Sequence, residues 1–254
     1  MARRMPPNKK PKTPPPPRGN QQRRVQAPQV RSGSRGDDLG DRHRKILYGV
    51  AGGGIIALIA VVLLITLGGG SKKNDQKVAS LMTAAGCTFK TVTASVPNGV
   101  THVASLTANL PWNTNPPSNG QHYPQWAVWG FYNDPVNPRM VVHNEEHGGV
   151  VLWWGPKTPR ATVDKLRQLY DEQTTGVFGT PLANLGSRVA ITAWTGDPTR
   201  YGRNGYYGQG HIATCLHYDD ATAKAFRAFR DAYRGHGPEG IPLSADEAGM
   251  GPTQ

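Results

Sequence analysis

Residues 143–154 read HNEEHGGVVLWW, a run of metal-ligating side-chain types that passes directly into a short apolar segment. The apolar part, 149–154, has the length and the bulky composition of a buried β-strand. The two glycines at 148 and 149 permit a sharp change of direction between the two parts. We therefore take this strand as the centre of a folded domain and place the other elements around it.

Other elements follow on both sides of this strand. Strands are also predicted where β-prone residues cluster or alternate, at 88–96, 188–195 and 211–216. Residues 159–173 show a helical pattern, and Thr158 and Pro159 are typical of a helix start. A final helix begins at Asp219 or Asp220, with aromatic residues on one face.

The remaining segments complete the predicted fold class. Residues 78–85 have the pattern of a short helix. Residues 97–139 are dense in proline, glycine and asparagine, which predicts long ordered loops. The sequence thus predicts an α+β domain: a small mixed or antiparallel sheet with two packed helices and long ordered loops, preceded by one transmembrane helix.

The uneven distribution of charge limits the function classes. The whole chain has a net charge of +12, but residues 1–45 hold 13 Lys and Arg against three acids. Residues 71–254 hold 16 Lys and Arg against 14 acids, so the folded part is nearly neutral. This excludes a basic nucleic-acid-binding domain. The basic tail contacts anionic lipid headgroups or only sets membrane topology, and both interpretations stay open.

Residues 46–68, ILYGVAGGGIIALIAVVLLITLG, contain no charged side chain. A helix of this length spans about 35 Å, enough to cross a bilayer. The basic excess before it predicts a cytoplasmic N-terminus and an extracytoplasmic C-terminal domain. The long basic region and the long apolar run favour an uncleaved anchor over a signal peptide.

The sequence then divides into five parts. They are a disordered basic cytoplasmic tail (1–45), a transmembrane helix (46–68), a linker (69–77), an extracytoplasmic globular domain (78–235) and a flexible C-terminal tail (236–254).

The two cysteines, Cys87 and Cys215, both follow the predicted membrane span. In an oxidising compartment they favour one disulfide that ties the start of the domain to its end. The alternative is that Cys215 and His217 bind a metal as a pair.

Four histidines lie before or within residues 143–154: His102, His122, His143 and His147. On a helical turn, positions i and i+4 share a face, so His143 and His147 can bind one ion. On a strand these two would stand about 13 Å apart, too far for a shared ion. The metal interpretation therefore requires a helical turn or a tight loop at 143–147.

Two other interpretations of the histidines stay open. The histidines and Glu146 can form a buried polar network that only supports the loops. Residues 143–147 also match the H-x-x-E-H signature of inverted zinc peptidases, with Glu146 as general base. That signature is short, a third protein ligand would be needed, and the strand follows at once.

A second unusual segment is 116–124, PPSNGQHYP, whose prolines and glycine fix a loop around His122. Aromatic residues flank it: Trp112, Trp126, Trp129, Phe131 and Tyr132. They form either an aromatic-walled binding pocket or an ordinary packed loop.

At these segments the chain resembles the domain of unknown function 3105 family, found in bacterial envelope proteins. The matching stretches are 99–102, 116–124, 129–132 (WGFY), 142–151 (VHNEEHGGVV), 192–194 (TAW), Cys215 and 229–239 (FRDAYRGHGPE). The resemblance implies a membrane-anchored bacterial protein and one shared constellation of His102, His122, His143, Glu146 and His147. The family pattern usually has an apolar residue where Glu145 stands, so we expect an added charge near the site.

These observations give one leading hypothesis and two alternatives. The leading hypothesis is a non-enzymatic protein of the bacterial cell membrane whose outer domain binds a ligand, foremost a transition metal, through the four histidines, with Glu146 supporting them. Imidazole ligands suit copper and zinc. The alternatives are a structural domain that contacts a protein or the cell wall without a metal, and a metal-dependent hydrolase. The sequence identifies no protein partner.

Overall fold

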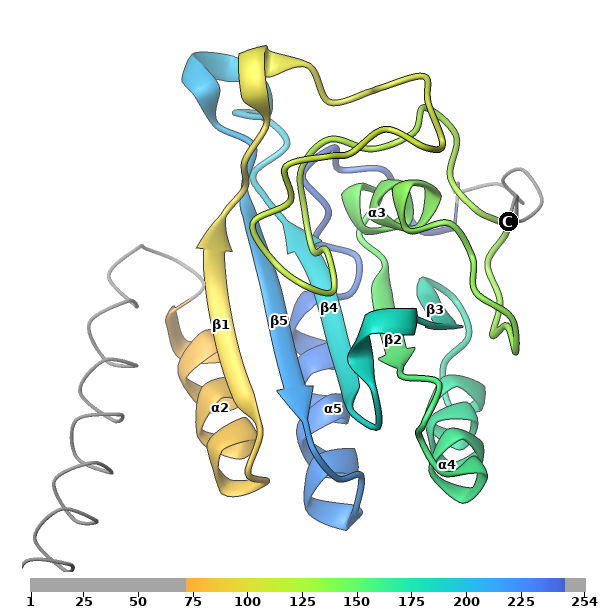
Figure 1. Ribbon diagram of the computed structural model, residues 1–254. Helices are drawn as coiled ribbons and strands as arrows, with labels where there is room; N and C mark the ends of the chain where they lie inside the picture. The colour runs from red at the N-terminus through yellow and green to blue at the C-terminus, as the bar shows by residue number, and fades with distance from the viewer. Residues whose placement is uncertain (1–71, 245–254) are drawn as a thin grey trace, which may run out of the picture. The chain divides into compact units, whose positions relative to one another are not determined.

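The structure is a computed structural model that describes residues 72–244. A five-stranded sheet of order β1-β5-β4-β2-β3 forms its centre (Figure 1). The strands are β1 (Thr88–Thr93), β2 (Val150–Trp154), β3 (Val177–Pro181), β4 (Val189–Thr195) and β5 (Gln209–Cys215). Only β2 and β3 pair in parallel, so the sheet is mixed. This confirms the predicted α+β class.

Three helices cover one face of the sheet. They are α2 (Lys72–Ala84), α4 (Arg160–Asp171) and α5 (Asp220–Tyr233). Alternate strand residues such as Val150, Leu152 and Ile191 point into this layer, where they pack against Leu166 and Phe229. The core on this face is almost wholly apolar, which is the pattern expected when amphipathic helices cover a sheet.

The opposite face of the sheet carries α3 (Pro138–Glu146) and the long loops between β1 and α3 (Figure 1). Val151 and Trp153 of β2 point to this side and pack with Met140 and Val141 of α3. The loops before α3 are ordered, as predicted, but the prediction of two packed helices was too low. The described part of the chain has four helices, and α3 lies within the histidine-rich segment.

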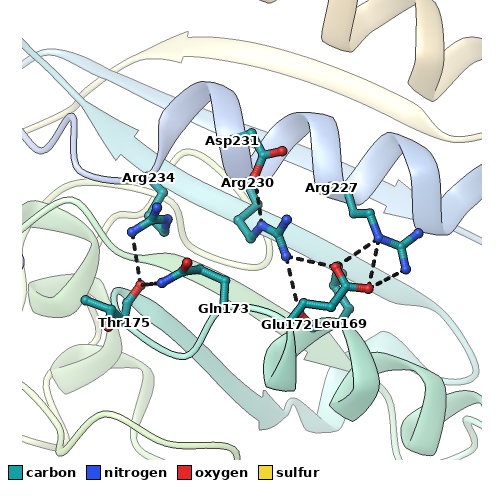
Figure 2. A network of polar contacts seen from close by, with 8 residues as sticks. All are labelled: Leu169, Glu172, Gln173, Thr175, Arg227, Arg230, Asp231 and Arg234. Atoms are coloured by element: carbon teal, nitrogen blue, oxygen red, sulfur yellow. Dashed lines mark hydrogen bonds and ion pairs between the residues drawn. The ribbon is translucent and has the colours of Figure 1, made fainter.

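Polar contacts fasten α4 to α5 on the helix-covered face (Figure 2). Glu172, which follows α4, accepts hydrogen bonds from Arg227 Nε at 2.9 Å and from Arg230 Nη1 at 3.2 Å. Farther along, Arg234 donates to the Thr175 carbonyl at 3.3 Å. These residues form a clamp between the ends of two helices.

The predicted disulfide is present between Cys87 and Cys215, which are 128 residues apart. It ties the start of β1 to the end of β5 and removes Cys215 from any metal site.

The folded part extends beyond the predicted limits of 78–235. Helix α2 begins at Lys72, inside the expected linker. Residues 236–244 are also part of the structure, because the Gly196 amide donates to the His236 carbonyl at 3.0 Å. Within residues 72–244, no helix has both the length and the apolar composition to span a membrane. The predicted span at 46–68, the basic tail at 1–45 and residues 245–254 lie outside the described residues.

Candidate metal centre

Helix α3 places three polar side chains at its C-terminal end. The helix begins after Asn137, whose side chain accepts a hydrogen bond from the Arg139 amide at 3.1 Å. His143 and Glu146 are one helical turn apart, and His147 is the C-cap residue. All three are buried, so residues 143–147 have the helical turn that the metal interpretation requires.

The exit from α3 requires glycine at position 148. Gly148 has φ +92°, and a Cβ there would stand 2.8 Å from the Gly237 amide nitrogen. The chain can therefore turn directly into β2 while residues 235–237 pack against the end of α3.

His102 and His122 come from two loop segments that form a short parallel bridge. The His122 amide donates to the Thr101 carbonyl at 2.9 Å, and the Val103 amide donates to the His122 carbonyl at 2.7 Å. The three rings of His102, His122 and His143 then meet, with centroids 4.8–5.0 Å apart.

Backbone carbonyls fix the tautomers of two of these rings. His122 Nδ1 lies 2.8 Å from the Gly120 carbonyl, and His143 Nδ1 lies 2.9 Å from the Tyr123 carbonyl. A carbonyl only accepts, so each Nδ1 carries the hydrogen and each neutral ring has an unprotonated Nε2. Burial, with the nearby His122, lowers the pKa of His143 to about 3, which keeps that ring neutral.

The Nε2 atoms of all three rings face the carboxylate of Glu146. Glu146 Oε2 lies 2.9 Å from His122 Nε2, 3.6 Å from His102 Nε2 and 3.9 Å from His143 Nε2. The 2.9 Å approach lacks hydrogen-bond geometry: among the described residues, neither His122 Nε2 nor Glu146 Oε2 has a hydrogen-bond partner. One ligand atom from each of the four residues lies within 4.8 Å of the others.

Two further contacts hold the carboxylate as an anion. Tyr201 donates its hydroxyl to Glu146 Oε1. Burial and the Glu146 charge raise the pKa of Tyr201, so its hydroxyl stays protonated. Burial opposes the ionisation of Glu146, but contacts from His102, His122 and Tyr201 outweigh it and lower its pKa. The contact with Glu146 also raises the pKa of the half-exposed His102.

His147, the fourth predicted histidine, lies beside this group rather than in it. Its Nε2 is 3.0 Å from His143 Nε2 and 3.4 Å from Glu239 Oε2. Glu146, His147 and Glu239 form a second group whose ligand atoms lie within 4.8 Å of one another. The structure thus brings all the predicted ligand residues to one place but divides them between two adjoining groups.

Burial disfavours the charge expected at Glu145. This side chain is fully buried and interacts with Thr192 of β4. Burial raises the pKa of Glu145 well above its usual range, which favours the uncharged carboxyl.

The aromatic residues around 116–124 lie partly at the histidines and partly against the core. Trp126 packs against the His143 and His147 rings, with centroids 5.4 and 4.7 Å away. Trp129 and Tyr132 instead pack on Phe178, at the edge of the core. The interpretation as an ordinary packed loop therefore holds for Trp129 and Tyr132.

Two residues at the site were not predicted from the sequence. Tyr201 lies in the loop between β4 and β5, and no motif singled it out. Glu239 lies in the expected tail, although it is the last residue of the 229–239 stretch that carries the family resemblance. That stretch was the available signal for Glu239.

Comparison with known proteins confirms the resemblance. A family model described as "Protein of unknown function (DUF3105)" matches residues 102–244, more than half of the chain. No curated protein and no solved structure matches the chain.

Proposed function

We propose that this chain, which belongs to the DUF3105 family of proteins of unknown function, binds a transition-metal ion through His102, His122, His143 and Glu146. The observation that carries the proposal is the contact between His122 Nε2 and Glu146 Oε2. Both atoms are fully buried, 2.9 Å apart and without a hydrogen bond from the described residues. If His122 Nε2 carries no proton, its lone pair and the carboxylate oxygen repel each other, and a metal ion bound by both atoms would remove that repulsion.

The energetics support a cation at this place. A buried carboxylate without a compensating charge destabilises the folded state by roughly several kcal/mol, even after the protein relaxes. Tyr201 offsets part of this cost at Oε1, and a proton on His102 can offset more. A divalent ion supplies the full compensation and uses the unprotonated nitrogens of His122 and His143 as ligands.

The surroundings of the ligands have the arrangement usual for metal-binding histidines. Such histidines generally donate their second ring N–H to a carbonyl or carboxylate, which fixes the orientation of the ring. His122 and His143 both donate Nδ1–H to backbone carbonyls. Three nitrogens and one oxygen suit zinc or copper.

The position of Glu146 argues against the hydrolase alternative. A general base needs a carboxylate that can reach a metal-bound water. Glu146 is fully buried among the histidines and accepts a hydrogen bond from the Tyr201 hydroxyl. It therefore has the position of a metal ligand. We therefore propose a binding role rather than catalysis.

The proposed setting is the bacterial cell membrane. The apolar run at 46–68 and the basic excess before it support a single span with residues 71–254 outside the cell and the tail near anionic lipid. Two variants with one added cysteine each, Ser34→Cys and Ser244→Cys, test this with a membrane-impermeant maleimide on intact cells. The native cysteines do not react because they form a disulfide. Labelling of position 244 alone agrees with the proposal, and labelling of position 34 contradicts it.

Metal content tests the binding function. The full-length protein in detergent is loaded with Zn²⁺ or Cu²⁺, desalted and measured by mass spectrometry. Wild type is expected to retain at least one ion per chain, and His122→Ala less than a tenth of that. His217→Ala, which changes an exposed histidine, serves as the control. Equal retention by both variants would remove His122 from the site, and no retention in wild type would favour the structural domain without a metal.

A further inference from the structure

His147 and Glu239 lie beside the four proposed ligands but are not used by them. We propose that they bind a second divalent cation together with Glu146, adjoining the first. Their ligand atoms and that of Glu146 lie within 4.8 Å of one another. This inference rests on the proposed function, because Glu146 belongs to both groups.

The backbone places both side chains at this point. His147 caps α3, where its amide donates to the His143 carbonyl at 3.2 Å. Glu239 arrives on a segment that is fastened to the end of α3, since the Gly235 amide donates to the Gly148 carbonyl at 2.8 Å. A Cβ at Gly237 would stand 2.3 Å from the Glu146 carbonyl oxygen, so this segment lies directly on the helix end.

The distances fit two neighbouring ions. His143 Nε2, which is unprotonated, lies 3.0 Å from His147 Nε2. This short spacing places the ligand atoms of the two groups next to each other, as ions about 3.5–4 Å apart in two-metal sites require. Glu146 is the candidate bridge, because its buried Oε2 has no hydrogen-bond partner among the described residues.

The two positions differ in exposure and in charge. His122, His143 and Glu146 surround the inner position and have side chains at most 4% exposed. Glu239 is 28% exposed and opens the outer position to solvent. Two carboxylates balance the charge of one divalent ion, so a second ion leaves an excess positive charge. The outer ion is therefore expected to bind at least about tenfold more weakly and to keep water or an anion as a ligand.

Native mass spectrometry of the full-length protein, titrated with Zn²⁺, tests the second ion. Wild type is expected to bind one ion and then a second, and Glu239→Gln to stop at one. His147→Gln should also stop at one. Asp164→Asn, which changes a 51% exposed carboxylate on α4, should still bind two.

Each other outcome contradicts a different statement. A plateau at one ion in wild type overturns the second ion and leaves the first in place. Two ions in Glu239→Gln with wild-type affinity overturn the assignment of Glu239. No ion in wild type overturns the proposed function itself.

Discussion

Two fully buried histidines, His211 and His122, lie on opposite faces of one sheet and have different surroundings. His211 has a hydroxyl at each ring nitrogen: Thr91 Oγ1 at 3.1 Å and Thr195 Oγ1 at 2.8 Å. His122 has a carbonyl at one nitrogen and, at the other, a carboxylate without hydrogen-bond geometry. The first is a completed polar contact of the core, whereas the second is the contact on which the proposed metal site rests. Burial alone does not mark a binding residue, whereas a buried polar atom without a hydrogen-bond partner calls for an explanation.

The same difference separates the two layers around the sheet. On the helix-covered face, apolar residues, the disulfide and the α4–α5 clamp account for stability. On the α3 face, the buried carboxylate of Glu146 lies at the end of α3, beside a buried histidine from the long loops. We therefore expect changes on the first face to alter stability and changes on the second to alter ion binding.

The largest expected effect on stability comes from the disulfide. Replacing both cysteines, Cys87→Ser with Cys215→Ser, frees a loop of 128 residues and should cost about 4–5 kcal/mol of unfolding free energy. Urea unfolding followed by circular dichroism measures this cost. At urea concentrations below its unfolding transition, the double variant should bind Zn²⁺ as wild type does. A cost under about 1 kcal/mol would show that the disulfide adds little to this face.

Acid should destabilise the helix-covered face through His211. Burial lowers the pKa of His211 to about 3, whereas an unfolded histidine titrates near 6.5. The unfolded chain therefore binds more protons between these values, and stability is lost as pH falls through this window. The expected contribution at pH 5 is about 2 kcal/mol relative to neutral pH.

The groups around His211 do not offset this loss. They are Thr91, Thr195 and the stacked ring of Tyr233, whose hydroxyl donates to Asp75 on α2. His211→Gln should flatten the stability curve between pH 5 and 7 in urea titrations. An unchanged slope would assign the acid loss to another group.

Tyr201→Phe should weaken ion binding without a matching loss of stability. The change removes the hydroxyl that orients Glu146 Oε1. Loss of such a supporting hydrogen bond usually lowers metal affinity about 10-fold to 100-fold. Zn²⁺ titration against a competing chelator measures the change, and Tyr206→Phe, in the same loop, is the control. Equal affinities of the two variants would remove Tyr201 from the site.

The smallest effect is expected at the clamp of Figure 2. Glu172→Gln breaks contacts to Arg227, which is 45% exposed, and to Arg230. The exposed pair with Arg227 contributes at most about 1 kcal/mol. Arg230 is only 11% exposed, but it keeps its hydrogen bonds to Asp231 and to the Leu169 carbonyl. Thermal unfolding should shift by only a few degrees, with no change in Zn²⁺ affinity. A larger loss would mean that the clamp, rather than the apolar core, holds α4 to α5.

The sequence predicted the elements whose side-chain pattern follows their burial. β2, β4 and β5 and the helices α4 and α5 were found at nearly their observed limits. Helix α3 was missed because its C-terminal turn buries histidine and glutamate instead of an apolar stripe, although Asn137 and Pro138 are a usual helix start.

Strand β3 was missed because its five residues include Gly179 and Pro181. Phe131 packs where a Cβ of residue 179 would stand, so this glycine reflects a contact distant in sequence. For the same reason the sequence grouped the histidines but placed neither Tyr201 nor Glu239 beside them.

X-ray absorption at the zinc edge, on full-length protein holding one equivalent of Zn²⁺, tests whether the histidines and Glu146 bind the metal. We expect three imidazole nitrogens and one carboxylate oxygen at about 2.0–2.1 Å, with imidazole scattering reduced in His122→Ala. An oxygen-only shell without imidazole scattering, or a spectrum unchanged by His122→Ala, would contradict it.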